Sequence, residues 1–183
     1  MMQSLPTDAV RSPPGSRSWR VLAWIGVLLI AALLVRTWMA QNAPMTWALV
    51  IFLVASLAIM TIGRLPGLFT LLLVVVALLN GAGGAFGWFE TYSAFDKLVH
   101  FYSGFAGLAA IGYLYARERN LERARLVGWC AAMGLVLGIG WEVIEGLMGN
   151  LEFVDTFFDI VVDTLGAALG GFFAWHALRP VPT

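Results

Sequence analysis

Long apolar segments, separated by short polar breaks, make up most of the chain. Each segment is close to the ~20 residues that an α-helix needs to cross the hydrocarbon core of a bilayer. The breaks contain Pro, Gly, Asn or clustered Arg, which are typical of turns and helix ends. This pattern predicts six transmembrane helices, over residues 19–40, 45–63, 66–88, 94–116, 126–148 and 154–177.

The predicted fold class is therefore all-α, a polytopic membrane helix bundle of about six transmembrane helices. Residues 19–179 form a single transmembrane domain, with no evident internal repeat. Residues 1–18 contain three prolines and two arginines but little to bury, and we expect a disordered cytoplasmic tail. A cleaved signal peptide is the alternative for the first apolar segment, but that segment is long and no Ala-x-Ala site follows.

Composition supports a membrane protein. Of the 183 residues, 60% are hydrophobic and only 12% are charged, against about 25% charged in soluble domains. The mean hydropathy is +0.83. A net charge of zero without a basic block argues against a nucleic-acid partner. The single cysteine, Cys130, lies in an apolar segment and is expected to pack as a small apolar residue.

Arginine and lysine positions predict the orientation, because short cytoplasmic loops carry an excess of these residues. With the N-terminus inside, only Arg36 and Lys97 fall on the outer side. Nine arginines fall on the inner side: Arg11, Arg17, Arg20, Arg64, Arg117, Arg119, Arg123, Arg125 and Arg179. We therefore expect a multi-pass membrane protein with both termini in the cytoplasm.

Glycines mark two further features. The glycine-rich residues 80–84 follow the third apolar segment and predict either a kink or a loop over the membrane surface, bordered by an interfacial belt of aromatic residues at 88–95. Two pairs at helical spacing, Gly134 with Gly138 and Gly166 with Gly170, predict close packing between the fifth and sixth spans.

Ionisable residues gather at the ends of three predicted spans. Each costs about 2.5–3.5 kcal/mol at the centre of a membrane helix, so each needs an explanation. Their spacings are i,i+3 or i,i+4, which places each set on one helix face. All fall within roughly the outer 15 Å of the membrane at ~1.5 Å rise per residue. The residues are Asp96, Lys97 and His100, then Glu142 and Glu145, then Asp155, Asp159 and Asp163.

Six carboxylates in a low-dielectric site require balancing cations. Bound metal, protons or a cationic substrate group would each serve. Oxygen ligands with one imidazole suit Mg, Mn or Zn better than a soft metal. The predicted metal ligands are Asp96, His100, Glu142, Glu145, Asp159 and Asp163, of which His100, Glu145 and Asp163 are the candidate acid–base groups. The other histidine, His176, is expected to anchor the cytoplasmic end.

Three motifs carry a resemblance to a known family. They are the DKLVHF segment at 96–101, the WEVIE segment at 141–145 and the DIVVDTLGA segment at 159–167. In this order they resemble VanZ-like membrane proteins, and more closely the related YjdF-like (DUF2238-type) inner-membrane proteins. VanZ-like proteins have Gln where Glu145 stands and Asn where Asp163 stands. The resemblance covers about residues 90–175 and implies a small bacterial inner-membrane protein.

Three functions are compatible with this pattern. The first is a metal-assisted enzyme acting on a lipid or lipid-linked envelope substrate at the periplasmic surface. The second is a small proton- or cation-coupled transporter that uses the same carboxylates. The third is a non-catalytic assembly or binding subunit whose acids recognise a basic partner. The confinement of the polar residues to one side of the membrane favours the first.

Overall fold

The structure is a computed structural model that describes residues 16–62, 64–147, 149 and 152–179. Six long helices and one short helix make up this part of the chain, which contains no strand. The helices are α1 (Ser16–Met39), α2 (Ala43–Ile62), α3 (Gly67–Phe86), α4 (Trp88–Thr91), α5 (Ser93–Ala116), α6 (Arg123–Leu147) and α7 (Phe153–Ala177). All six long helices are long and apolar enough to cross a membrane. The predicted all-α polytopic membrane bundle is confirmed.

Helix bounds lie within a few residues of the predicted spans. α1 begins at Ser16, inside the segment expected to be a tail, and residues 1–15 of that tail lie outside the described residues. The third segment, predicted at 66–88, is divided into α3 and α4. Gly87 separates them because its φ of 67° is left-handed, and its N–H donates to the carbonyl of Gly83, as in many helix C-caps.

The glycine-rich residues 80–84 are helical and form the last turns of α3. The Asn80 side chain donates to the Val76 carbonyl at 3.0 Å, within the same helix. A methyl group on Gly83 would overlap the rings of Phe89 and Phe95. The run therefore lets α4 and the start of α5 pack closely on α3, and it forms neither a break nor a surface loop.

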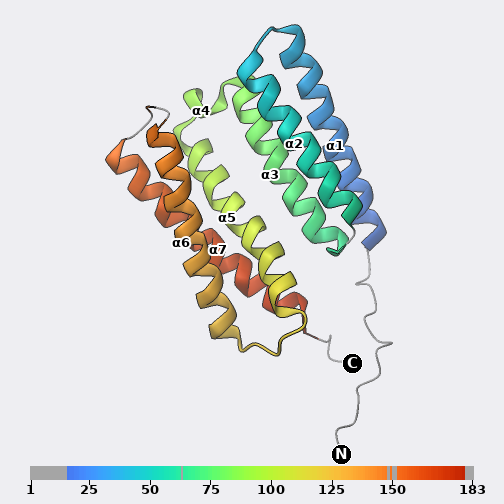
Figure 1. Cartoon of the computed structure of the whole chain (residues 1–183), viewed down its shortest axis with the longest axis vertical. Helices are drawn as coiled ribbons and strands as arrows, with labels where there is room; N and C mark the ends of the chain where they lie inside the picture. The colour runs from blue at the N-terminus through green and yellow to red at the C-terminus, as the bar shows by residue number, and fades with distance from the viewer. Residues whose placement is uncertain (1–15, 63, 148, 150–151, 180–183) are drawn as a thin grey trace, which may run out of the picture.

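Two groups of three long helices lie side by side (Figure 1). In the first, α1, α2 and α3 enclose an aliphatic core that includes Ile30, Leu49 and Val74, none of which is exposed. In the second, α7 packs along both α5 and α6. The two groups join mainly along α3 and α5. The Phe69 ring lies 4.7 Å from that of Tyr113 in this seam.

Glycines set the packing of α7. A methyl group on Gly166 or Gly170 would overlap the backbone carbonyl of Phe101 or Phe105, so both glycines face α5. A methyl group on Gly134 would overlap Ala167, so the α6 glycine faces α7. Close packing of α6 on α7 was predicted with glycines from both helices, but Gly166 and Gly170 lie against α5 instead. Sequence spacing identifies a small-residue face but not the helix that it meets.

Because each group has three spans, the first helix of the second group crosses the membrane in the direction opposite to the first helix of the first group. α1 and α3 run toward the end of the molecule that carries α4, whereas α5 and α7 run away from it (Figure 1). The start of α1 and the end of α7 consequently lie at the same end, opposite α4. The start of α5, the end of α6 and the start of α7, where the ionisable residues cluster in the sequence, come together at the α4 end of the molecule.

Candidate functional site

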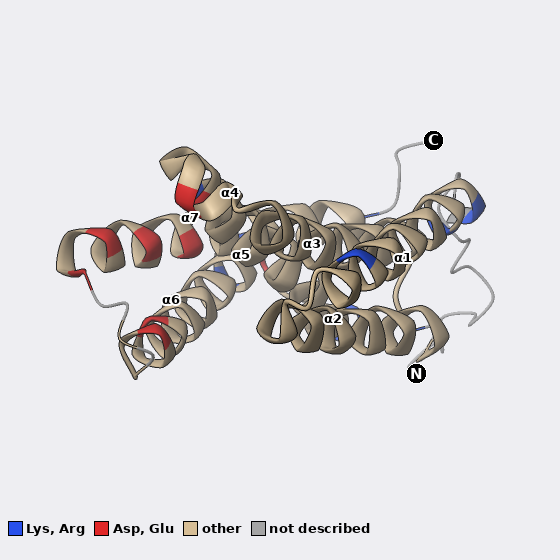
Figure 2. Ribbon diagram, turned by 90° about the horizontal axis from the view of Figure 1, so that it is seen from above, with Lys and Arg blue, Asp and Glu red and all other residues tan. Residues whose placement is uncertain are grey.

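Acidic residues, red in Figure 2, concentrate at the α4 end of α5, α6 and α7. Three of them are buried in the described structure: Glu142 is 5% exposed, Asp159 2% and Asp163 8%. No other acidic residue in the described part of the chain is buried. Burying a carboxylate in a helix bundle is costly without a partner, so the partners of these three groups define the site.

Lys97 is the central cation. Its Nζ donates to Asp96 Oδ2 at 3.0 Å and to Asp159 Oδ2 at 2.8 Å, and it also contacts Asp155. Asp159 Oδ1 lies 2.7 Å from the same nitrogen but accepts no hydrogen bond, so that contact is an ion pair. The i, i+4 spacing of Asp155 and Asp159 on α7 aligns both with one lysine on α5. One ammonium thus faces three carboxylates and leaves negative charge uncompensated.

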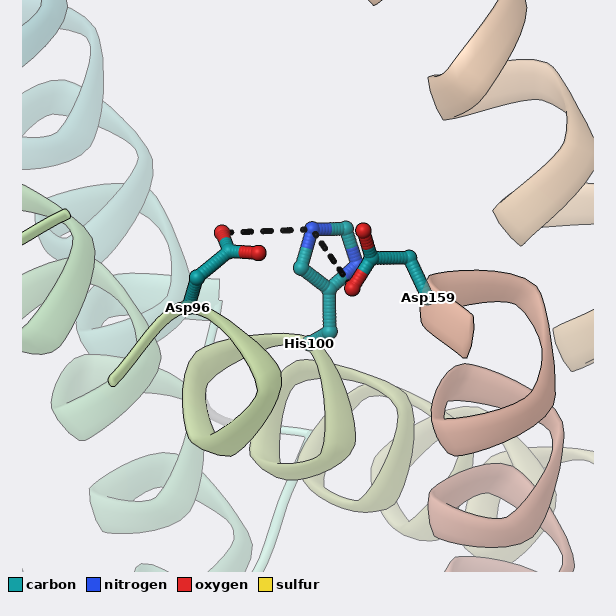
Figure 3. Close-up of side chains that lie close together, drawn as sticks. All are labelled: Asp96, His100 and Asp159. Carbon is teal, nitrogen blue, oxygen red and sulfur yellow. Dashed lines mark ion pairs between the residues drawn. The ribbon is translucent and has the colours of Figure 1, made fainter. Parts of the chain in front are cut away.

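His100 is held in a defined orientation. Its Nδ1 lies 3.2 Å from Asp163 Oδ2, within hydrogen-bond distance. Its Nε2 lies 3.8 Å from Asp96 Oδ1 and 3.9 Å from Asp159 Oδ1, too far for hydrogen bonds (Figure 3). With the ring proton on Nδ1 donated to Asp163, the lone pair of Nε2 faces the space between two carboxylates.

This arrangement fits a divalent ion. The ligand atoms of Asp96, His100 and Asp159 lie within 4.8 Å of one another. A tetrahedral ion about 2.0–2.2 Å from each ligand would hold neighbouring ligand atoms roughly 3.3–3.6 Å apart, a few tenths of an ångström less than the 3.8 and 3.9 Å found at Nε2. Metal-binding histidines almost always donate their second nitrogen to a carboxylate or carbonyl, which is the position of Asp163. Lys97 is the competing cation, because it already contacts Asp96 and Asp159.

Glu142 adds an unpaired buried oxygen. Its Oε1 has no hydrogen-bond partner among the described residues. A methyl group on Gly138, one turn earlier on α6, would lie 3.0 Å from Asp163 Oδ2, so Glu142 lies on the same, α7-facing side of α6. An orphaned buried carboxylate oxygen calls for an explanation, and a bound cation would provide one.

A cavity of about 520 Å³ opens from the site. Its upper part is lined by Asp96, His100, Ser103, Trp141, Glu145 and Asp163. Glu145 Oε1 accepts a hydrogen bond from Trp141 Nε1 at 2.8 Å. Phe52 of α2 and Asn80 of α3 line the opposite wall, so α5 is the floor between α6 on one side and α2 and α3 on the other. The volume lies within the ~300–1,000 Å³ of small-molecule pockets.

The predicted site residues are thus distributed unevenly. The structure brings together Asp96, His100, Asp159 and Asp163, and it places Glu145 in the adjoining cavity. Glu142 lies on the α7 face of α6 and does not line that cavity. Lys97 was predicted to lie in the cluster, but its pairing with Asp96, Asp155 and Asp159 together was not.

Two residues interpreted as non-functional lie away from the site. Cys130 is fully buried, and its Sγ lies 3.7 Å from the Leu108 carbonyl oxygen in the packing between α5 and α6. His176 lies in the last turn of α7, at the opposite end of the helix from Asp155.

The fold and its charged centre define a multi-pass helical membrane protein with an Asp–His–Lys cluster at one end of the bundle. The family described as "Predicted membrane protein (DUF2238)" matches residues 17–179, and the chain belongs to this family. This match confirms the resemblance to YjdF-like proteins. Neither the comparison with curated proteins nor the comparison with solved structures gives a match.

Proposed function

We propose that this protein is a metal-assisted enzyme that acts on the headgroup of a lipid or lipid-linked envelope molecule at the outer face of the bacterial inner membrane. The supporting observation is the His100 ring, with one nitrogen at Asp163 and the other facing Asp96 and Asp159. Three protein ligands with room for a fourth are typical of catalytic rather than structural metal sites.

Each residue then has a defined role. Asp96, His100 and Asp159 would hold the ion, and Asp163 would fix the His100 ring. A divalent ion held there would supply a Lewis acid for a phosphoryl or acyl oxygen and a water nucleophile at neutral pH. Since His100 is occupied on both nitrogens, the proton-accepting group in this scheme is Glu145, whose carboxylate lines the same cavity.

A cation-coupled transporter is the second candidate, and the two three-span groups of opposite direction favour it, as in many transporters with inverted halves. The lower part of the cavity argues against it. Its lining residues are apolar: Gly107, Leu108, Ile111, Gly134 and Leu137. A charged substrate or ion would meet no polar partner there, so the polar chemistry is confined to the outer end.

The outer-face location rests on the arginine distribution. Arg64, Arg117 and Arg179 follow helix ends opposite α4, where cytoplasmic loops are expected to lie. In a Cys130→Ala background, a membrane-impermeant maleimide added to intact spheroplasts should label Glu90→Cys in α4. It should label Glu118→Cys only after the membrane is opened. The reverse pattern would place the acidic site on the cytoplasmic side.

Metal analysis tests the site directly. Purified wild-type protein should retain about one equivalent of Zn, Mn or Mg per chain, and the matching ion should raise its melting temperature. A ligand present at 100 times its dissociation constant stabilises by about 2.7 kcal/mol. Asp159→Asn should lose this shift and should differ little from wild type after chelation.

The matched control is Asp155→Asn, which makes the same substitution one turn away on α7. Asp155 is 55% exposed and its ion pair among the described residues is with Lys97, so the Asp155→Asn protein should keep its metal response. Two results together would contradict the enzyme: wild-type protein that holds no metal, and a melting temperature of Asp159→Asn that falls equally with and without chelator. The non-catalytic binding subunit would then be the remaining candidate. Envelope lipids of deletion cells expressing wild type, Asp96→Asn or Glu142→Gln should differ if the enzyme is active.

A further inference from the structure

The lower part of the cavity extends far beyond the charged site. Its lining runs along α5 from Asp96 to Ile111, a distance of about 22 Å at ~1.5 Å per residue. One leaflet of a ~30 Å hydrocarbon core is about 15 Å deep, so this length covers a leaflet and more. A polar upper end followed by an apolar trough matches a molecule with one charged end and a long hydrocarbon chain.

The cavity opens sideways. α2 and α6 make no contact with each other in the described structure, and they lie on opposite sides of α5 (Figure 1). Ile111 on the floor is 43% exposed and Leu137 on the α6 wall is 50% exposed. At this depth in a membrane the surrounding medium is lipid hydrocarbon, so a lipid chain can enter between α2 and α6 without crossing water.

The charge of the upper end selects among lipids. Asp96, Glu145 and Asp163 line it, whereas Lys97 does not. Lys97 and a divalent ion together would offset only three of the six clustered carboxylates. The residual negative charge favours a headgroup with an amine over one with only anionic or neutral groups, since like charge is repelled at short range.

We infer that the cavity holds one hydrocarbon chain of an amine-bearing phospholipid, which enters sideways between α2 and α6 and places its headgroup at Asp96 and Glu145. This inference rests on the proposed function, because it names the substrate class of that site. It adds a second part to the site, the apolar trough, whose contribution can be removed without touching a charged residue.

Gly107 is a position where the trough can be filled without changing a charged residue. It lines the trough, and a methyl group built on it meets no atom within 4 Å. Gly107→Leu should therefore fill the trough without displacing its neighbours. Gly128 on α6 also has open space around it but does not line the cavity, which makes Gly128→Leu the matched control. Ile111→Trp fills the trough from a second position, in case one variant fails to fold.

The experiment uses the full chain in vesicles of equal parts phosphatidylethanolamine and phosphatidylglycerol. A trace of either lipid carries a photoactivatable diazirine on one acyl chain. With the phosphatidylethanolamine probe, cross-links should map to trough residues such as Ile111 and Leu137. Gly107→Leu and Ile111→Trp should lower this labelling about tenfold, equivalent to about 1.4 kcal/mol of binding. Gly128→Leu should label as wild type.

Two results would overturn the inference: trough labelling unchanged in both filled variants, or equal trough labelling by the phosphatidylglycerol probe. Failure of the proposed function is separable, because His100→Ala should abolish metal retention while the apolar trough stays intact. Trough labelling in a protein that holds no metal would keep the lipid site and remove the metal chemistry. Retained metal without trough labelling would keep the metal chemistry and remove the lipid site.

Discussion

The two three-helix groups have similar lengths and opposite chemistry. Within α1–α3 the buried polar residues are hydroxyls, Thr37, Thr46, Ser56 and Thr70, and the core is aliphatic. Within α5–α7 the buried polar residues are Glu142, Asp159 and Asp163, and the helices meet through glycines. A buried hydroxyl can be satisfied by its own helix, whereas a buried carboxylate needs a partner from another helix.

This comparison indicates that α1–α3 mainly stabilise the fold, whereas α5–α7 carry the charged cluster. The first group can be stable through packing alone, and its contribution to the cavity is limited to Phe52 of α2 and Asn80 of α3. The second group depends on charges that lie within one cluster and on backbones in close contact. Substitutions in α5–α7 should therefore be costlier than equivalent ones in α1–α3, and the following three pairs test that expectation.

The largest difference is expected between Gly166→Ala and Gly26→Ala. The new methyl group on Gly166 would overlap the Phe101 backbone, so α5 and α7 would have to separate. On Gly26 it would meet Val74 Cγ1, a side-chain methyl group, and no backbone atom, so a smaller shift of the helices relieves the overlap. We expect a loss of about 3 kcal/mol for Gly166→Ala and about 1 kcal/mol for Gly26→Ala, within the range for overpacking. Thermal unfolding in detergent micelles measures both, and equal losses would contradict that expectation.

An intermediate difference is expected between Lys97→Met and Arg36→Met, each of which removes a basic side chain near the α4 end. Lys97 serves three carboxylates but is 28% exposed, so we expect about 2 kcal/mol rather than the ~3–5 kcal/mol of a fully buried pair. Arg36 donates to the Ala85 carbonyl at 2.6 Å and lies over Phe86, which is worth about 1 kcal/mol or less. Added divalent metal should partly restore Lys97→Met, because it can replace the missing ammonium. Metal should leave Arg36→Met unchanged.

The smallest effects are expected for hydroxyls, and here the two groups should not differ. Thr46 Oγ1 donates to the Asn42 carbonyl at 2.8 Å, and Thr164 Oγ1 donates to the Ile160 carbonyl at 2.7 Å. Thr46→Val and Thr164→Val should each cost no more than about 0.6 kcal/mol, the average for side-chain hydrogen bonds between membrane helices. Chemical unfolding in mixed micelles resolves this value. A much larger loss in Thr164→Val would mean that α5–α7 is sensitive to any polar change, not to charge in particular.

The sequence predicts the spans well because membrane helices must be both apolar and about 20 residues long. It also predicts that the ionisable residues share one end, since the direction of each span follows from counting the spans before it. Helix ends that depend on the backbone conformation of a single residue were harder to predict. The division of the 66–88 segment depends on the left-handed φ of Gly87, whereas the neighbouring glycines Gly81, Gly83 and Gly84 remain helical.

Pairing between helices was not predictable. Periodicity places Asp155 and Asp159 on one face of α7 but does not say that Lys97 lies opposite. It likewise places Glu142 and Glu145 near each other on α6, although their environments differ: Glu142 is buried, and Glu145 lines the cavity. Such distinctions depend on the rotation of each helix about its axis, which packing against neighbours determines.

The Lys97–Asp159 contact also has a consequence for biosynthesis. Its two partners are separated by 62 residues in the chain. At about 5–20 residues per second, the ribosome completes Asp159 roughly 3–12 s after Lys97. During that interval α5 has neither α7 to pack on nor the aspartates 155, 159 and 163 to neutralise its lysine and orient its histidine. The first turns of α5 must therefore wait near the headgroups or within the insertion machinery, and the site is assembled only when the last helix enters the membrane.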